Sequence, residues 1–220
     1  MSYGSSKRQM MEKNKIRYLG LGGIVGPVLF SASVVITAGV RTDYSHITHF
    51  ISELGATGTP TEEWMNFVGF VPSGILIVLF AIALLTFSKK KPMAVIGSVF
   101  MMLFGAGMAI AGLFSCDQGC IPNGSLESLI HDRVSAVTFI SAIAGILLSG
   151  FSFNKLSFFR KFWGFSLFTG LVSIVLLAIM INSFESRNLT GLWQRLLLLF
   201  LFLWTSRIGI HIFKNTEQIS

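Results

Sequence analysis

The sequence predicts an all-α polytopic membrane protein, a bundle of six transmembrane helices with both termini in the cytoplasm. Of its 220 residues, 52% are hydrophobic and only 12% are charged. Charged residues usually make up about a quarter of a soluble domain. The apolar residues gather in stretches of about 20 residues, the length that an α-helix needs to cross a hydrocarbon core. A backbone in lipid must satisfy its own hydrogen bonds, so each stretch is expected to be helical.

These stretches leave little room for a soluble domain. A basic tail is expected over residues 1–17, the membrane domain over 18–213 and a second tail over 214–220. The first stretch is too long for the apolar part of a signal peptide, so we interpret it as a retained anchor. The loop after it, residues 41–63, is long for a link between neighbouring helices and is expected to hold a short helix. The predicted spans cover residues 18–40, 64–88, 93–114, 129–150, 162–182 and 191–213.

Basic residues concentrate on one side of the predicted helices. Positive residues prefer the cytoplasmic loops of membrane proteins, so this side, with both termini, is predicted to be cytoplasmic. The arrangement explains the net charge of +7, and no nucleic-acid partner is expected. Membrane lipids are the expected partners, and the inner membrane of a bacterium is the predicted location. The twelve basic residues of this side are Lys7, Arg8, Lys13, Lys15, Arg17, Lys89, Lys90, Lys91, Lys155, Arg160, Lys161 and Lys214.

Acidic residues and histidines show the opposite distribution and gather at the outer ends of the helices. Ionisable groups at membrane depth are costly and often functional, so any chemistry is expected on the outer side. The second outer loop contains Cys116 and Cys120, with Gly119 between them to allow a tight closure. In an oxidising compartment this pair is expected to form a disulfide, and a metal site or two free thiols are the alternatives.

The first outer loop carries the clearest candidates for a site. If its middle is helical, His46, His49 and Glu53 lie on one face. Two imidazoles and a carboxylate could then hold a divalent metal ion, which is the cofactor that the sequence suggests. The alternative, which we favour, is an interfacial amphipathic helix with Ile47, Phe50, Ile51 and Leu54 in lipid and the histidines in water.

Later spans add polar residues near the same outer end. His131 opens the fourth span, and an imidazole there suits proton transfer or metal ligation. Asp132 follows it, where a carboxylate in the first turn also stabilises the helix dipole. Gln194 and Arg195 open the sixth span, and the arginine is expected to meet an anionic lipid headgroup or a carboxylate. The candidate carboxylates are Glu53, Asp117 and Asp132.

A set of short motifs carries a family resemblance. The first is Gly-x-x-x-Pro over residues 23–27, and the most specific is Ile-Ser-Glu-Leu-Gly over 51–55. Together they resemble the bacterial membrane-protein family catalogued as domain of unknown function 998. The likeness covers most of the chain and implies six spans without an assigned activity. Further matching positions are Tyr44, Ser45, Ala56, Pro60, Asn66, Gly69, Phe70, Ala111, Gly112, Leu113, Phe114, Asp117, Gly119, His131, Gln194 and Arg195.

A more distant similarity links the chain to the eukaryotic DRAM/Sfk-type membrane proteins. It rests on the motif at residues 51–55 and on the pair His131 and Asp132. Members of that group are linked to autophagy, lipid handling and the remodelling of lipid anchors, so the resemblance implies a role with lipids. The sequence departs from the group's pattern at Glu53, where the group has aspartate, and in its two cysteines.

Three functions are compatible with these residues. The preferred one is an outward-facing polar pocket that binds a lipid or a lipid-linked headgroup. The second is a membrane hydrolase or acyl-transfer enzyme, with His131 as general base and Ser52 as nucleophile. Its orienting residue or metal ligand would be Glu53 or Asp117. The third is a small-solute transporter, which the lack of matching prolines in the two halves disfavours. The residues expected to bind the ligand are Arg195, Asn66, Asp43, Asp132 and Gln194.

Overall fold

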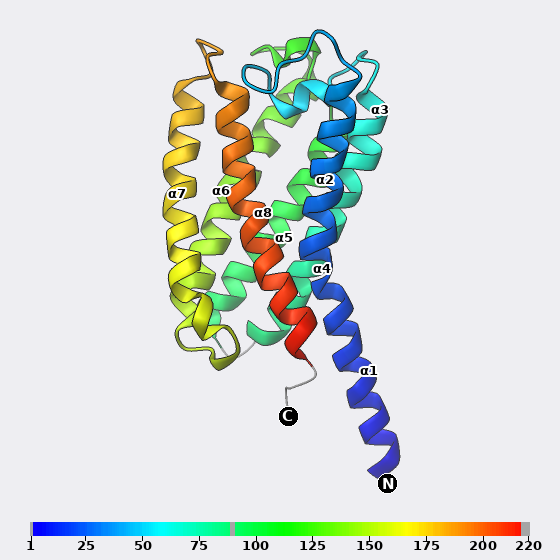
Figure 1. Ribbon diagram of the computed structural model, residues 1–220, viewed down its shortest axis with the longest axis vertical. Coiled ribbons are helices and arrows are strands. Elements are labelled where there is room, and N and C mark those ends of the chain that lie inside the picture. Colours follow the sequence, from blue (N-terminus) through cyan, green and yellow to red (C-terminus); the bar gives the residue numbers. More distant parts are fainter. Residues whose placement is uncertain (1, 89–90, 217–220) are drawn as a thin grey trace.

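The structure, a computed structural model that describes residues 2–88 and 91–216, is a bundle of α-helices (Figure 1). Within these residues, six helical stretches are long and apolar enough to cross a membrane. The predicted all-α fold with six spans is therefore confirmed. The spans run over Met10–Gly39, Glu62–Ser88, Pro92–Leu113, Leu126–Phe153, Ser157–Asn182 and Thr190–Asn215.

The first span consists of α1 (Ser2–Gly20) and α2 (Gly22–Gly39), which meet at Leu21. The predicted basic tail, residues 1–17, is therefore mostly helical and continues into the first span. The other long helices are α4 (Val71–Ser88), α5 (Pro92–Leu113), α6 (Leu126–Phe153), α7 (Trp163–Asn182) and α8 (Thr190–Asn215). The shorter helical segments are η1 (Ile51–Gly55), α3 (Glu62–Trp64), η2 (Met65–Phe70), η3 (Gln118–Cys120) and η4 (Ser157–Phe162).

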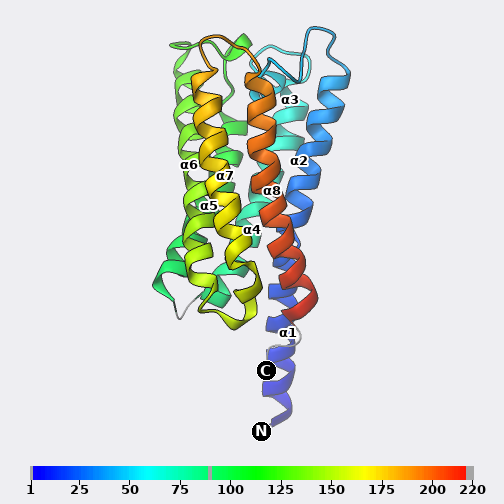
Figure 2. The same ribbon diagram turned by 60° about the vertical axis from the view of Figure 1, so that its left-hand side comes forward.

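The long helices form a closed ring. From α4 to α8 each helix packs against the next, and α2 contacts both α4 and α8 (Figure 2). Large side chains such as Phe80, Phe104 and Trp204 are fully buried in its interior. Glycines allow the closest approaches, because a Cβ on Gly74 of α4 would lie 2.4 Å from the carbonyl oxygen of Gly105 in α5.

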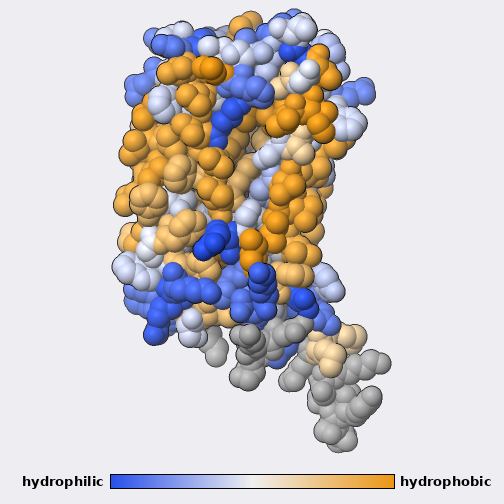
Figure 3. Space-filling model, viewed as in Figure 1, coloured by the Kyte–Doolittle hydropathy of each residue, from blue (hydrophilic) through white to orange (hydrophobic). Residues whose placement is uncertain are grey.

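Three loops, residues 40–61, 114–125 and 183–189, gather at one end of the bundle, which we call the loop end (Figure 1). The two ends of the described chain lie toward the opposite end. On the side shown in Figure 3, hydrophilic residues gather toward both ends, and most of the surface between them is apolar. This distribution is the one expected for a bundle surrounded by lipid.

The second span departs from α-helical geometry close to the loop end. Its residues Met65–Phe70 form a π-helical turn, η2, just before Pro72. Proline has no N–H for the carbonyl four residues earlier, and helices commonly distort at such points. The turn contains Asn66, whose Nδ2 donates to the carbonyl of Gly55 and to Oγ of Ser115, both at 2.9 Å. Asn66 thereby fixes the first loop to the end of α5.

Candidate functional site

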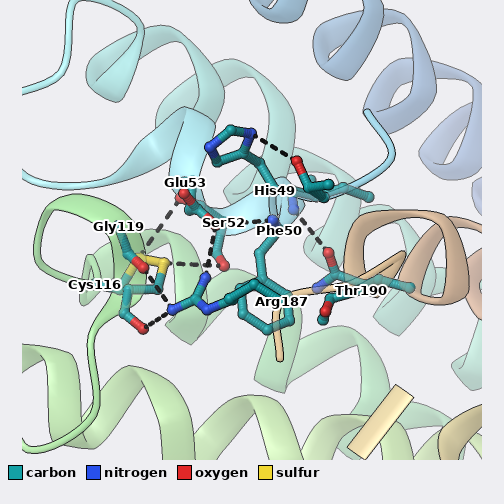
Figure 4. Close-up of polar contacts among 12 residues, drawn as sticks. His49, Phe50, Ser52, Glu53, Cys116, Gly119, Arg187 and Thr190 are labelled. Carbon is teal, nitrogen blue, oxygen red and sulfur yellow. Dashed lines mark hydrogen bonds and ion pairs between the residues drawn. A yellow bond between two sulfur atoms is a disulfide. The ribbon is translucent and has the colours of Figure 1, made fainter. Parts of the chain in front are cut away.

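The three loops of the loop end are joined by Arg187 (Figure 4). Its Nη1 lies 3.0 Å from Oε1 of Glu53 in the first loop, which makes an ion pair. Its Nη2 donates to the carbonyl oxygens of Gly119 and Cys120 in the second loop, at 2.8 and 3.0 Å. The guanidinium also lies 4.8 Å from the ring centroid of Phe50. Arg187 therefore holds the loop layer together.

Glu53 forms hydrogen bonds through both its side-chain carboxylate and its backbone carbonyl. Its side chain is 8% exposed, and Oε1 accepts a 2.9 Å hydrogen bond from the backbone nitrogen of Phe50. Its carbonyl oxygen accepts from Nη1 of Arg41 at 2.8 Å. A carboxylate buried to this degree needs a compensating cation, and Arg187 supplies it. These contacts give Glu53 a role in holding the loops.

Arg195 also binds the first loop, but through neutral groups. Its guanidinium donates to Nδ1 of His46 at 3.2 Å, to the carbonyl of His49 at 3.1 Å, and to the hydroxyl of Tyr44. No carboxylate pairs with Arg195 among the described residues, so that expected partner is wrong. Arg195 lines the groove between α2 and α8, and the anionic lipid headgroup stays a prediction. Burial raises the pKa of Tyr44, and burial together with the charge of Arg195 lowers the pKa of His46.

The predicted metal ligands do not share a helical face. A short helix in the first loop is confirmed, but η1 covers only Ile51–Gly55, and His46 and His49 precede it. The expected placement of Ile51 and Leu54 in lipid is wrong, because both side chains are buried in the protein core. Nδ1 of His49 accepts from the backbone nitrogen of Ser45 at 2.9 Å, which holds a turn of the loop. In the part of the chain that the structure describes, no group of three or more His, Cys, Asp or Glu side chains could hold a metal ion.

The second loop is closed on itself and fastened to α6. Cys116 and Cys120 are joined by a disulfide. Asp117 accepts hydrogen bonds from the backbone nitrogen and Oγ of Ser125, at 2.6 and 2.8 Å, and these bonds lower the pKa of its carboxyl group. Oγ of Ser125 in turn accepts from the backbone nitrogen of Ser128 and caps α6. Asp117 thus fixes the start of a helix.

Two other predicted site residues also satisfy neighbouring polar groups. His131 is 5% exposed, and its Nδ1 lies 3.0 and 2.8 Å from the carbonyl oxygens of Ala111 and Phe114 at the end of α5. Because carbonyls only accept, Nδ1 carries a proton, and the ring binds carbonyls that the helix end leaves open. Nε of Arg41 donates to Asp43 at 3.0 Å, and this hydrogen bond lowers the pKa of the Asp43 carboxyl group.

The residues of the predicted hydrolase do not form a catalytic pair. Oγ of Ser52 lies 3.4 Å from Sγ of Cys120, whereas Nδ1 of His131 is bound to carbonyls. No hydrogen bond joins Ser52 to His131 among the residues that the structure describes. A nucleophile and its base need to lie within hydrogen-bond reach, so this arrangement gives the enzyme hypothesis no support.

The main pocket lies in the loop-end half of the bundle and has a volume of about 500 Å³. Its walls are mostly apolar and include Phe104 of α5, Phe139 of α6 and Leu177 of α7. Polar side chains lie at its loop end: Ser52, His131, Asp132, Glu185, Arg187 and Gln194. Four of the predicted catalytic and ligand-binding residues therefore line one pocket. The other predicted catalytic and ligand-binding residues, which lie outside its lining, are Asp43, Glu53, Asn66, Asp117 and Arg195.

The pocket opens sideways between α6 and α7. Away from the loop end the two helices touch, because a Cβ on Gly170 of α7 would lie 2.4 Å from Leu147 of α6. Nearer the loop end, the lining residues Ala136 and Ile140 of α6 and Ile181 of α7 are exposed. An apolar pocket with exposed apolar side chains at its mouth is accessible from the lipid phase.

Two further hollows flank the main pocket. A polar pocket of about 420 Å³ is lined by Asp43, His49 and Glu53 together with parts of the second loop. Since Glu53 lines this pocket and Arg187 lines the main one, their ion pair lies between the two. A groove of about 460 Å³ between α2 and α8 contains Arg195 and belongs to the side shown in Figure 3.

Arg187 is the main residue of the loop end that the sequence analysis missed. It lies in a short loop, at a positive φ of 54°, and belongs to no motif. A signal was nevertheless present, because a glutamate in an apolar block such as Ile-Ser-Glu-Leu requires a cation when it is buried. Four arginines lie near the outer ends of the predicted spans and were open to this choice: Arg41, Arg133, Arg187 and Arg195.

No curated protein and no solved structure matches the chain. The similarity to DRAM/Sfk-type proteins, and the role with lipids that it implies, therefore stays a prediction. A family model described as "Protein of unknown function (DUF998)" matches residues 24–211, which is most of the chain and all of the described loop end. The chain therefore belongs to the DUF998 family, as a multi-span membrane protein.

Proposed function

We propose that the protein binds an amphipathic lipid, with an acyl chain in the main pocket and the polar headgroup at its loop end. The observation that carries this proposal is an apolar cavity of about 500 Å³ whose lining is exposed at Ala136 and Ile140 of α6 and Ile181 of α7. Ligand pockets commonly have volumes of about 300–1,000 Å³. Apolar walls that face the hydrocarbon phase suit an alkyl chain better than a water-soluble ligand.

The loop end of the pocket offers hydrogen-bonding groups that the fold leaves unused. The side-chain oxygen of Gln194 accepts from the backbone nitrogen of Ile51 at 2.7 Å, which fixes the orientation of the amide. Its NH₂ group makes no hydrogen bond with the described residues and supplies two donors for phosphate or ester oxygens. The hydroxyl of Ser52 lies in the same lining. These groups support a headgroup bound beneath the loops.

In this proposal the loop end faces away from the cytoplasm, and the membrane is the inner membrane of a bacterium. The orientation is supported by the basic residues at the opposite end of the described helices. Lys91 precedes α5, and Lys155, Arg160 and Lys161 lie between α6 and α7. Positive residues of short loops favour the cytoplasmic side.

The test is mass spectrometry of lipids that remain bound after gentle solubilisation, compared between two variants of α6. Ala136 lines the pocket and is exposed at its mouth, so Ala136→Trp fills the opening. Val137, the next residue, is 57% exposed and lies outside the lining, so Val137→Trp adds the same bulk to the lipid-facing surface.

We expect the wild type and Val137→Trp to retain about one lipid per chain and Ala136→Trp to retain several-fold less. If the new tryptophan excludes about five methylene groups of the acyl chain, the pocket loses about 0.8 kcal/mol of favourable burial for each of them. That loss is more than enough for the expected effect. Equal lipid retention by the two variants, or a wild type without bound lipid, would refute the proposal. Far-UV circular dichroism of both variants confirms that the helices are formed.

A further inference from the structure

We propose further that the headgroup bound by this pocket carries an ammonium group, an inference that rests on the proposed function. Two carboxylates lie at the mouth of the pocket, Asp132 on α6 and Glu185 in the loop after α7. Both residues are exposed, and neither forms an ion pair or a hydrogen bond with any residue that the structure describes. They differ in this from Glu53 and Asp117, whose oxygens already bind partners.

The charge around the mouth is negative. Arg187 is the cation in the pocket lining, and Glu53 compensates it at 3.0 Å. Arg133 follows Asp132 in the chain but lies outside the lining. The charge of Arg187 also acts on Asp132, but the three carboxylates of Glu53, Asp132 and Glu185 outnumber this one arginine. Such a mouth attracts a cationic group and disfavours a headgroup with net negative charge.

A third acceptor in the same lining comes from a buried side chain. His131 is 5% exposed, and its Nδ1 donates to the carbonyls of Ala111 and Phe114. In the neutral ring the other nitrogen, Nε2, has a free lone pair. No hydrogen bond reaches Nε2 from the described part of the chain. An acceptor that is held in place and left unpaired beside a cavity favours a ligand that donates hydrogen bonds, as an ammonium does.

The spacing of residues on α6 connects the charged mouth to the apolar pocket. Asp132, Ala136 and Ile140 follow one another at intervals of four, so they form one stripe along the helix. All three line the pocket. A lipid whose ammonium meets Asp132 can therefore lay its chain along Ala136 and Ile140. Glu185 approaches the same mouth from the side of α7.

The experiment compares three phospholipids with identical acyl chains in equal amounts. The full chain is reconstituted in nanodiscs that contain phosphatidylethanolamine, phosphatidylcholine and phosphatidylglycerol, then extracted gently, and the bound lipid is identified by native mass spectrometry. Phosphatidylethanolamine and phosphatidylcholine both carry the cation, whereas phosphatidylglycerol does not. One partly exposed charge pair corresponds to about a fivefold preference. We expect phosphatidylethanolamine to exceed phosphatidylglycerol by about fivefold or more. Phosphatidylcholine, whose quaternary ammonium has the charge but no N–H for Nε2 of His131, should lie between the two.

The double variant Asp132→Asn/Glu185→Gln separates this inference from the proposed function. Both changes keep the side-chain shape at exposed positions and remove the charge, and we expect the preference for the ammonium lipids to disappear. The control Glu63→Gln removes an exposed carboxylate of the loop end outside the pocket lining and should keep the preference. A wild type that retains phosphatidylglycerol equally, or a double variant with unchanged preference, overturns the ammonium inference and leaves lipid binding intact. A wild type that retains no lipid after extraction overturns both the ammonium inference and the proposed lipid binding.

Discussion

The ion pair between Glu53 and Arg187 is predicted to stabilise the loop end, and the interaction free energy of the two side chains can be measured with a double-mutant cycle. Arg187→Ala removes the 3.0 Å ion pair and the two hydrogen bonds to carbonyls of the second loop. It leaves the Glu53 carboxylate, with a side chain 8% exposed, beside one remaining backbone N–H. Breaking a buried ion pair typically costs about 3–5 kcal/mol. Because the Arg187 side chain is 35% exposed, water can replace part of its contacts, and we expect about 2–3 kcal/mol.

The assay is equilibrium unfolding in mixed micelles with increasing sodium dodecyl sulfate, followed by tryptophan fluorescence. It is applied to the wild type, Arg187→Ala, Glu53→Ala and the double variant. In Glu53→Ala the arginine loses its carboxylate but keeps its two carbonyls, so a smaller loss of about 1–2 kcal/mol is expected. Because both single changes remove the same ion pair, their losses should overlap by about 1–2 kcal/mol in the double variant.

A matched control removes an arginine that the structure shows without such contacts. Arg133 is exposed and forms no ion pair or hydrogen bond with the described residues. Arg133→Ala is therefore expected to change the unfolding free energy by less than about 0.5 kcal/mol. Losses of Arg187→Ala and Glu53→Ala that add within about 0.3–0.5 kcal/mol would show that the two side chains are independent and refute the reasoning.

Two further predictions concern the same end of the bundle. Gly191→Ala should lower the unfolding free energy by about 1–3 kcal/mol, because its Cβ would lie 2.3 Å from the carbonyl oxygen of His49. Gly39→Ala, whose Cβ meets nothing within 4 Å, is the control, and equal effects would contradict the clash. The stabilising effect of Asp117 should be full at neutral pH and be lost as the pH falls below 3.8 through its lowered pKa. Unfolding of the wild type and Asp117→Asn at several pH values checks this, and a difference that grows with acidity would contradict the sign.

The helices could be predicted from the sequence because lipid leaves the backbone few alternatives. The fifth span was expected over residues 162–182, and α7 covers Trp163–Asn182. The polar candidates were also expected at one end, and the charge asymmetry of the loops was enough to show this. Both predictions depend on properties that add up along the chain, namely hydropathy and net charge, and need no knowledge of which side chains meet.

The pairing of side chains at the loop end could not be predicted in the same way. Glu53 pairs with Arg187 instead of Arg195, because the third loop turns back at positive φ over Arg187 and Leu189. Short irregular loops of this kind have no periodic pattern that specifies their path. The proposed helical face of histidines failed for a related reason. The loop backbone around His49 closes a turn with Ser45, and the helix starts only after Phe50.

In this protein, structural and functional polar residues differ less in residue type than in their hydrogen bonds. A structural side chain has its donors and acceptors occupied, whereas a functional one keeps some of them without a partner. A buried charged group near lipid needs a partner, so most of the ionisable residues that a sequence singles out are engaged in holding loops. Glu53, Asp117 and Arg195 are of this kind. The carboxylates of Asp132 and Glu185, the NH₂ of Gln194 and Nε2 of His131 keep their capacity, and all four residues line one pocket that opens to lipid. Groups that the fold leaves unpaired at one place are the groups that a ligand can bind.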